Sequence, residues 1–294
     1  MKHIINTMRP SFLILAIACV FLGTAAAIWT AGRVNGWHVA LAFIGGLASH
    51  ACVNALNEYT DNKSGLDSRT SRTPFSGGSG TFLAAPNQVH LALWVTIITA
   101  LIVTAIGVYF TIVIGWQIAL IGVIGLLIIF TYTRWLNQQP FFCLIAPGLG
   151  FGTLMVLGTF FVLTSTVTLA AVIISFIPFF LVSNLLLLNQ FPDVEPDQSV
   201  GRRHYPILIG RKASARIYSG FLIATYVFII LGVLLNITPV WTLLGLLSIV
   251  IAIPNIKSVL KNAEDVAQLL PSLGQNVLLN LLTPVLVGIG FLIA

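Results

Sequence analysis

Two short polar segments interrupt a chain that is otherwise strongly apolar. The first is NEYTDNKSGLD at residues 57–67, and the second is NQFPDVEPDQSVGRR at residues 189–203. Only 7% of the chain is charged, yet these two segments hold six of its eight acidic residues. Carboxylates crowded into two places of such a chain favour a chemical role for both segments.

Both segments place Asn and Asp side chains at intervals of four residues, and the first adds a further Asp. The six residues are Asn57, Asp61 and Asp67 in the first segment and Asn189, Asp193 and Asp197 in the second. Their oxygen atoms are the hard ligands that suit Mg²⁺, which usually binds through one or two carboxylates together with substrate phosphates. Two such clusters facing each other would hold magnesium ions against a diphosphate.

Basic side chains close to both clusters could neutralise the remaining charge of a diphosphate. Candidates are Lys63, Arg72, Arg202 and Arg203, of which the arginines can bind phosphate oxygens in a bidentate manner. The stretch RTPFSGGSG at 72–80 is rich in Gly and Ser. It is either a flexible linker or a loop whose backbone N–H groups approach a phosphate.

The first cluster continues a polar stripe on the helix that precedes it. His50, Asn54, Asn57 and Asp61 are spaced i, i+4, i+7 and i+11, so they share one face of an α-helix. A polar stripe facing lipid would be costly, and we expect this face to look into a helix bundle or a wet cavity. His50 by itself is explained more simply by hydrogen bonds between helices.

The second cluster contains two prolines that oppose a regular helix. On a helix Asn189, Asp193 and Asp197 would again share a face, but Pro192 and Pro196 each remove a backbone hydrogen bond and favour a kink or a turn. The sequence leaves open whether a helix continues through this segment. The alternative to a binding site here is a solvated loop whose charges only anchor the topology.

The elements that must position these side chains are membrane-spanning helices. The chain has 294 residues, is 57% hydrophobic and has a mean hydropathy of +1.00, whereas soluble domains contain roughly 45–50% apolar residues. Apolar runs near the ~20 residues that cross a bilayer lie at about 11–30, 38–57, 88–110, 113–132, 142–164, 167–188, 215–235, 238–256 and 275–294. We predict an all-α integral membrane protein, with about nine transmembrane helices in one domain over 1–294.

The charges predict the orientation of these helices, because short cytoplasmic loops are enriched in Lys and Arg. With the N-terminus in the cytoplasm, thirteen of the fourteen basic residues fall on the inner side, and only Arg33 falls outside. All eight acidic residues fall on the inner side as well, so both acidic segments reach the same membrane face. The net charge of +6 follows from this rule, and no nucleic-acid partner is expected.

The two acidic segments lie in the two long inner connections, roughly 58–87 and 189–214. Each connection follows a helix that runs from outside to inside. Asn57-x-x-x-Asp61 at the start of one is echoed by Asn189-x-x-x-Asp193 at the start of the other. We therefore interpret the chain as two weakly related four-helix halves, about 1–135 and 136–257, followed by a last helix at 275–294.

The two segments together resemble the acidic motifs of the UbiA superfamily of intramembrane prenyltransferases. NEYTDNKSGLD is similar to the first motif, N-D-x-x-D followed by a further Asp, and DVEPDQSVGRR to the second, D-x-x-x-D-x-x-x-G-[KR]. The step from Asp61 to Asp67, with Gly65 between them, is most similar to the branch that prenylates 1,4-dihydroxy-2-naphthoate in menaquinone synthesis. MRPSFL at 8–13 and FTYTRW at 130–135 extend the resemblance over nearly the whole chain.

This resemblance implies a UbiA-type bundle and Mg²⁺-dependent transfer of a polyprenyl group from its diphosphate to an aromatic acceptor, 1,4-dihydroxy-2-naphthoate or a related quinone precursor. The enzyme would lie in the cell inner (plasma) membrane, with its active site at the cytoplasmic face. The six Asn and Asp residues named above would hold the metal. The residues implied to contact the diphosphate are Arg9, Lys63, Arg72, Arg134 and Arg202. The implied catalytic groups are Asp61, Asp193, Asp197 and Tyr132, with Tyr132 near the allylic carbon.

Two features depart from the family pattern. Glu58 stands where the family commonly has Asp, which leaves its role open between ligand, neighbouring group and bystander. GLGFG at 148–152 lacks the acidic residue often found there, and its two outer glycines, four apart, favour close helix packing. One alternative is a membrane class I terpene cyclase, or another prenyl-diphosphate-processing enzyme on the same scaffold. A more distant one is a cation-coupled transporter, although transporter sites tend to lie near the bilayer midplane.

Overall fold

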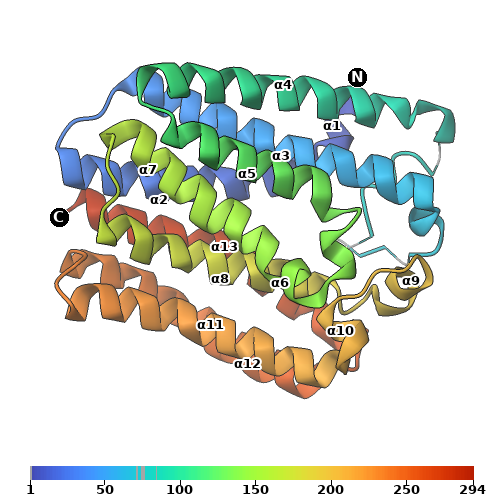
Figure 1. Ribbon diagram of the computed structural model, residues 1–294. Helices are drawn as coiled ribbons and strands as arrows, with labels where there is room; N and C mark the ends of the chain where they lie inside the picture. The colour runs from blue at the N-terminus through green and yellow to red at the C-terminus, as the bar shows by residue number, and fades with distance from the viewer. Residues whose placement is uncertain (1, 71, 74–76, 84) are drawn as a thin grey trace.

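The computed structural model describes residues 2–70, 72–73, 77–83 and 85–294, and within these ranges it contains helices and no β-strand. Figure 1 shows long helices that run side by side along one axis of the molecule. The long elements are α2 (Pro10–Ala31), α3 (Gly36–Ser64), α4 (His90–Val113), α5 (Gln117–Tyr132), α8 (Leu169–Asn189), α11 (Gly210–Leu234), α12 (Ile249–Asn262) and α13 (Val266–Leu292). One further span combines α6 (Pro140–Gly148), the π-helix η4 (Leu149–Val156) and α7 (Leu157–Thr164).

Short helices complete the chain, and most of them lie in the connections. They are α1 (Lys2–Thr7), α9 (Val194–Ser199), α10 (Tyr205–Leu208) and the 3₁₀ turns η1 (Leu66–Ser68), η2 (Pro86–Gln88), η3 (Leu136–Gln138) and η5 (Val240–Ser248). The last of these, η5, leads directly into α12.

The described ranges contain eight helical segments long and apolar enough to cross a membrane, and α5 adds a shorter apolar helix. Together they account for the nine helices expected from the sequence. The protein is a multi-pass membrane protein with an all-α fold, as predicted.

The last helix is longer than the hydropathy pattern indicated. It begins at Val266 rather than near 275, and the side chain of Asp265 caps it by accepting a hydrogen bond from the backbone N–H of Gln268. Gln268, Pro271 and Ser272 interrupt the apolar run before 275, but Ser272 is almost fully buried, as are Asn276 and Asn280 further along the helix. Ser272 donates to Ser258 Oγ of α12 at 2.8 Å and Asn276 to the backbone oxygen of Asn184 in α8 at 3.2 Å, which ties α13 to its neighbours. Asn280 donates to the backbone oxygen of Asn276 within its own helix.

A buried polar network joins the helices of the second half of the chain. The Tyr218 hydroxyl of α11 donates to Asn255 Oδ1 of α12 at 2.6 Å and lies 3.2 Å from Asn276 Oδ1 of α13. Asn184 of α8 donates to the backbone oxygen of Tyr218, and Asn276 donates to that of Asn184. Side-chain hydrogen bonds of this kind hold transmembrane helices together in the absence of a hydrophobic driving force.

The glycines of GLGFG serve close helix packing, as their spacing predicted. A Cβ atom on Gly148 or Gly152 would overlap the backbone of Phe179 in α8. On the other side of this span, Gly23 of α2 is so close that a Cβ atom would lie 2.8 Å from the backbone oxygen of Val156. The π-helical segment is thus fixed between α2 and α8.

The two chain termini lie at opposite ends of the bundle, and α9 and α10 lie at the same end as the N-terminus (Figure 1). The long helices α3 and α8 both end there, so the segments that follow them meet at one end of the molecule.

Candidate active site

The two acidic segments surround one polar cavity of about 140 Å³ at the loop-rich end of the bundle. Five of the eight acidic residues of the chain contribute to its walls. The charged and amide side chains that line it are Arg9, Asn57, Glu58, Asp61, Asp67, Asn137, Asn189, Gln190, Asp193, Asp197 and Arg202. All six predicted metal ligands are therefore brought together.

The first segment reaches the cavity because α3 continues to Ser64, well past the apolar run. Gly65 ends the helix in the left-handed region, with φ 75°, a conformation that favours glycine. The chain then turns through η1, which returns Asp67 to the cavity wall, where its side chain is almost fully buried.

The four residues of the polar stripe on α3 do not all line the polar cavity. Asn57 and Asp61 line the polar cavity. Asn54 instead donates to the backbone oxygen of Met8 at 2.9 Å, which ties the N-terminal segment to α3. His50 lies deeper in the bundle, with its ring centroid 4.6 Å from that of Phe151.

The prolines of the second segment break the helix, and the broken path still reaches the cavity. Helix α8 ends at Asn189, and the short helix α9 begins at Val194 after a turn that contains Pro192. Pro196 falls in the first turn of α9, where a missing N–H costs little. Asn189, Asp193 and Asp197 thus lie on no common helix, yet all three line the polar cavity.

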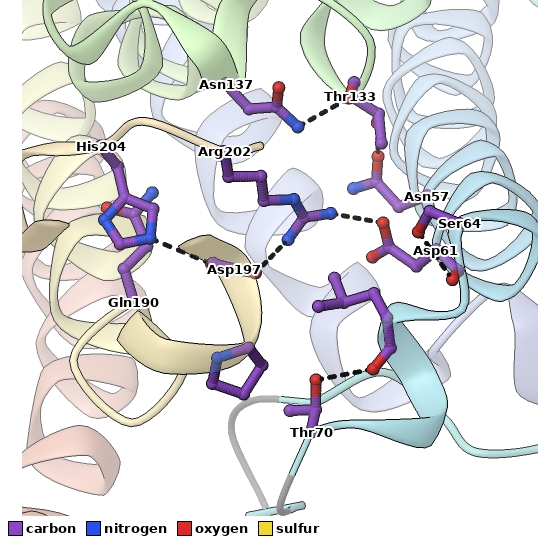
Figure 2. A network of polar contacts seen from close by, with 12 residues as sticks. Asn57, Asp61, Ser64, Thr70, Thr133, Asn137, Gln190, Asp197, Arg202 and His204 are labelled. Atoms are coloured by element: carbon purple, nitrogen blue, oxygen red, sulfur yellow. Dashed lines mark hydrogen bonds and ion pairs between the residues drawn. The ribbon is translucent and has the colours of Figure 1, made fainter. Parts of the chain in front are cut away.

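Arg202 joins the two acidic segments across the cavity (Figure 2). Its Nη2 atom pairs with Asp61 Oδ1, and its Nη1 atom donates to Asp197 Oδ1 at 2.9 Å. The other oxygen of Asp197 lies 3.0 Å from Nε2 of His204, whose side chain is buried. Burial alone would lower the pKa of Arg202, but the two carboxylates raise it above its ordinary value, so the guanidinium stays charged.

Glu58 lines the cavity and also accepts hydrogen bonds from Ser79 of the Gly/Ser-rich loop. Its Oε1 accepts from the backbone N–H of Ser79 at 2.6 Å, and its Oε2 accepts from the Ser79 hydroxyl at 2.7 Å. The neighbouring Gly77 and Gly78 line the cavity and have φ values of 84° and 69°. Residues 74–76 of this stretch lie outside the described residues.

The basic residues named from the sequence differ in their distance from the cavity. Arg9 and Arg202 line it. Arg72 packs against Gly77 and Gly80, and its charge acts on Asp67. Lys63 is exposed, with Nζ 5.0 Å from the ring centroid of Tyr59. Arg134 is exposed as well and lines neither cavity described here.

The donor atoms around the cavity fit a hard divalent cation such as Mg²⁺. Among the described residues, the buried Oδ1 atom of Asn189 has no hydrogen-bond partner, which is unfavourable unless a ligand or ion satisfies it. Burial, together with the nearby charges of Glu58 and Asp61, raises the pKa of Asp67 to about 7. A cation would offset these penalties.

No three His, Cys, Asp or Glu side chains in the described part of the chain converge closely enough to hold a metal ion by themselves. Mg²⁺ usually binds through one or two carboxylates, and substrate phosphates and water complete its coordination.

A second, apolar cavity of about 300 Å³ adjoins the polar one. The two share Arg9, Asn57, Tyr132, Leu186 and Asn189 in their walls. Leu41 and Asn57, which both line the apolar cavity, lie about 24 Å apart along α3 at 1.5 Å per residue. The combined space suits an amphiphile with a charged head and a long hydrocarbon tail.

Thr133, Asn137 and His204 also line the polar cavity, and none of the three was singled out from the sequence. Thr133 donates from its hydroxyl to Asn57 Oδ1, and Asn137 donates to the backbone oxygen of Thr133 at 2.6 Å (Figure 2). His204 directly follows the GRR run, and this placement is the signal that could have identified it. The Tyr132 hydroxyl lies 3.8 Å from Cys143 Sγ, in the wall that both cavities share.

Comparison with known proteins gives a consistent result. A profile described as the UbiA prenyltransferase family matches residues 16–270. A Bacillus subtilis (strain 168) protein named 1,4-dihydroxy-2-naphthoate octaprenyltransferase is 27% identical over 261 residues, which cover 86% of this chain and 81% of that protein.

Two solved structures share the fold of this chain. The apo structure of a UbiA homolog from Aeropyrum pernix K1 has a TM-score of 0.73 at 16% identity, covering 96% of this chain and 97% of that one. A UbiA homolog from Archaeoglobus fulgidus bound to GPP and Mg²⁺ has a TM-score of 0.65 at 16% identity, covering 99% and 100%.

Proposed function

The chain belongs to the UbiA prenyltransferase family and is a prenyltransferase, and we propose that it transfers a polyprenyl group from its diphosphate to 1,4-dihydroxy-2-naphthoate or a related quinone precursor. One observation carries the proposal: a polar cavity walled by five acidic residues shares part of its wall with an apolar cavity along the helix bundle. The first would take the diphosphate and the second the hydrocarbon tail, at about 0.8 kcal/mol for each buried CH₂.

The residues around the polar cavity have roles that follow from their chemistry. Asn57, Asp61, Asp67, Asn189, Asp193 and Asp197 would hold Mg²⁺. When bound, Mg²⁺ would stabilise the negative charge that develops on the leaving diphosphate. Arg9 and Arg202 would add fixed positive charge on the same oxygens.

The junction between the cavities is where the allylic carbon would lie. Tyr132 supplies an aromatic face there, and Phe12 supplies another in the wall of the apolar cavity, where its ring centroid lies 4.9 Å from the Arg9 guanidinium. Aromatic faces attract positive charge, so they would stabilise an allylic cation while the apolar walls keep water away. The electron-rich ring of the acceptor would then attack that carbon.

The acceptor is proposed from the names of relatives and from the spacing of Asp61 and Asp67. The B. subtilis relative carries the naphthoate name at moderate identity. We also propose that the site faces the cytoplasm and that the protein lies in the inner (plasma) membrane, since thirteen of the fourteen basic residues fall on that side if the N-terminus does. The two four-helix halves, about 1–135 and 136–257, would then each contribute one acidic segment.

The test is an assay with purified protein, Mg²⁺, a radiolabelled polyprenyl diphosphate and a panel of acceptors. We expect a prenylated product with 1,4-dihydroxy-2-naphthoate, less with 4-hydroxybenzoate, and none after a chelator is added. Release of diphosphate without any acceptor product would contradict the proposal and point to a cyclase or a hydrolase.

A further inference from the structure

Arg202 is the residue that physically connects the two acidic segments. One arm of its guanidinium pairs with Asp61 of the first segment and the other with Asp197 of the second. The side chains of Arg202 and Asp61 are 21% and 19% exposed, and that of Asp197 only 4%. The pairing is therefore largely shielded from solvent and is stronger than a surface ion pair.

The backbone around Arg202 fixes this position. Gly201 adopts φ 84°, which favours glycine, and the N–H of Arg202 donates to the backbone oxygen of Asp197 at 3.1 Å. The next residue, Arg203, donates from its N–H to the backbone oxygen of Asn137 at 3.0 Å. His204 holds the second oxygen of Asp197, so Asp197 has protein partners on both of its oxygens.

The same two carboxylates are proposed metal ligands, which sets up a competition. Mg²⁺ binds carboxylate oxygens at about 2.0–2.1 Å. A guanidinium that contacts those same oxygens would then lie roughly 4 Å from the ion, with two like charges at short range. Arg202 and a metal ion can therefore share Asp61 and Asp197 only at a cost in free energy.

We propose that Arg202 competes with the divalent cation for Asp61 and Asp197, and that a diphosphate relieves the competition by taking up the guanidinium. Metal and donor would then bind cooperatively: each would raise the affinity for the other by the same factor. The identity of the diphosphate as the donor's head group rests on the proposed function; the competition itself rests on the contacts of Arg202 alone. Metal would therefore bind weakly without donor.

The test measures metal binding in the absence of any reaction. Wild-type protein, Arg202→Gln and Arg203→Gln are purified in detergent and titrated with Mn²⁺, with free Mn²⁺ followed by its EPR signal. Arg203 is the matched control because it loses the same charge one position away, while its side chain is exposed and lines neither cavity. Each titration is repeated with methylenediphosphonate, a stable diphosphate analogue, and corrected for its binding of Mn²⁺ in solution.

We expect Arg202→Gln to bind Mn²⁺ alone tighter than wild type by roughly tenfold or more, because a unit charge about 4 Å from a divalent ion matters by at least that factor even in water. Arg203→Gln should match wild type within about twofold. The analogue should tighten Mn²⁺ binding in wild type and much less in Arg202→Gln. If Arg202→Gln binds Mn²⁺ alone no tighter than Arg203→Gln, the competition is refuted.

A second variant guards against loss of folding in Arg202→Gln. Arg202→Lys keeps the charge but lacks the planar fork that spans two carboxylates, so it should shift Mn²⁺ affinity in the same direction by a smaller factor. An unchanged or weaker affinity in a folded Arg202→Lys protein would also overturn the proposal. If the proposed function is wrong but the competition is real, neither wild type nor any variant forms prenylated product, while the shift in Mn²⁺ affinity persists.

Discussion

Replacing Glu58 by Gln tests whether this residue anchors the Gly/Ser-rich loop or binds metal. The carboxylate accepts two hydrogen bonds from Ser79, at 2.6 Å from its N–H and 2.7 Å from its hydroxyl. Hydrogen bonds to a charged group contribute about 1.5–3 kcal/mol, against about 0.5–1.5 kcal/mol for neutral pairs. Neutralising Glu58 should therefore cost about 1 kcal/mol for each bond and about 2 kcal/mol in total, a factor of about 30.

The assay is prenyl transfer as a function of donor concentration at saturating Mg²⁺, and of Mg²⁺ concentration at saturating donor. We expect the KM for the donor to rise by up to about 30-fold. Without the hydrogen bonds between Glu58 and Ser79, Gly77 and Gly78 should move away from the cavity that they line. The Mg²⁺ concentration for half-maximal rate should change little. Ser79→Ala, which removes only the hydroxyl partner, should give a smaller effect in the same direction.

A double-mutant comparison sharpens this result. Because both changes break the same contact, the effects of Glu58→Gln and Ser79→Ala should be less than additive. If Glu58→Gln instead raises the Mg²⁺ requirement tenfold or more while Ser79→Ala behaves as wild type, Glu58 is a metal ligand and the loop-anchor reasoning is wrong.

Three further outcomes are expected. Gly152→Ala should lower the stability of the protein in detergent by about 1–3 kcal/mol in a thermal unfolding assay, because its Cβ meets the Phe179 backbone, whereas Gly150→Ala, with open space around it, should not. Gly122→Leu fills part of the apolar cavity and should raise the KM for long-chain donors more than for geranyl diphosphate. In intact cells a membrane-impermeant maleimide should label Thr166→Cys but label Ser68→Cys only after permeabilisation, and the reverse pattern would overturn the proposed orientation.

The fold could be predicted from the sequence because each helix is marked by its own long run of apolar residues. Runs of apolar residues locate the helices, and lipid leaves few other ways to satisfy the backbone. The start of α13 was misplaced because Pro271, Ser272 and Gly274 read as a break in the apolar run, although the helix continues through them and Ser272 faces the buried interior. Whether a polar residue in a span faces lipid or protein depends on neighbouring helices, which one sequence does not display.

The residues of the site were predictable by type and spacing, and their contacts were not. Arg9 and Arg134 were both expected to contact the diphosphate, but of the two only Arg9 lines the cavities. Arg9 lies in the turn between α1 and α2. The role of Glu58 depends on Ser79, twenty-one residues away. The break at Pro192 was foreseen as a possibility; that the broken path still brings Asp193 and Asp197 to the same cavity as Asp61 required the fold.

The most direct test of the account is the Mg²⁺ dependence of prenyl transfer in Asp61→Asn and Asp193→Asn, one variant from each acidic segment. Glu264→Gln is the control, since this carboxylate is exposed and lines neither cavity. The account predicts that both Asp variants lose at least about a hundredfold in rate at Mg²⁺ concentrations that saturate the wild type, while Glu264→Gln is unaffected. Wild-type rates and an unchanged Mg²⁺ requirement in either Asp variant would contradict the claim that the two segments form one metal-diphosphate site.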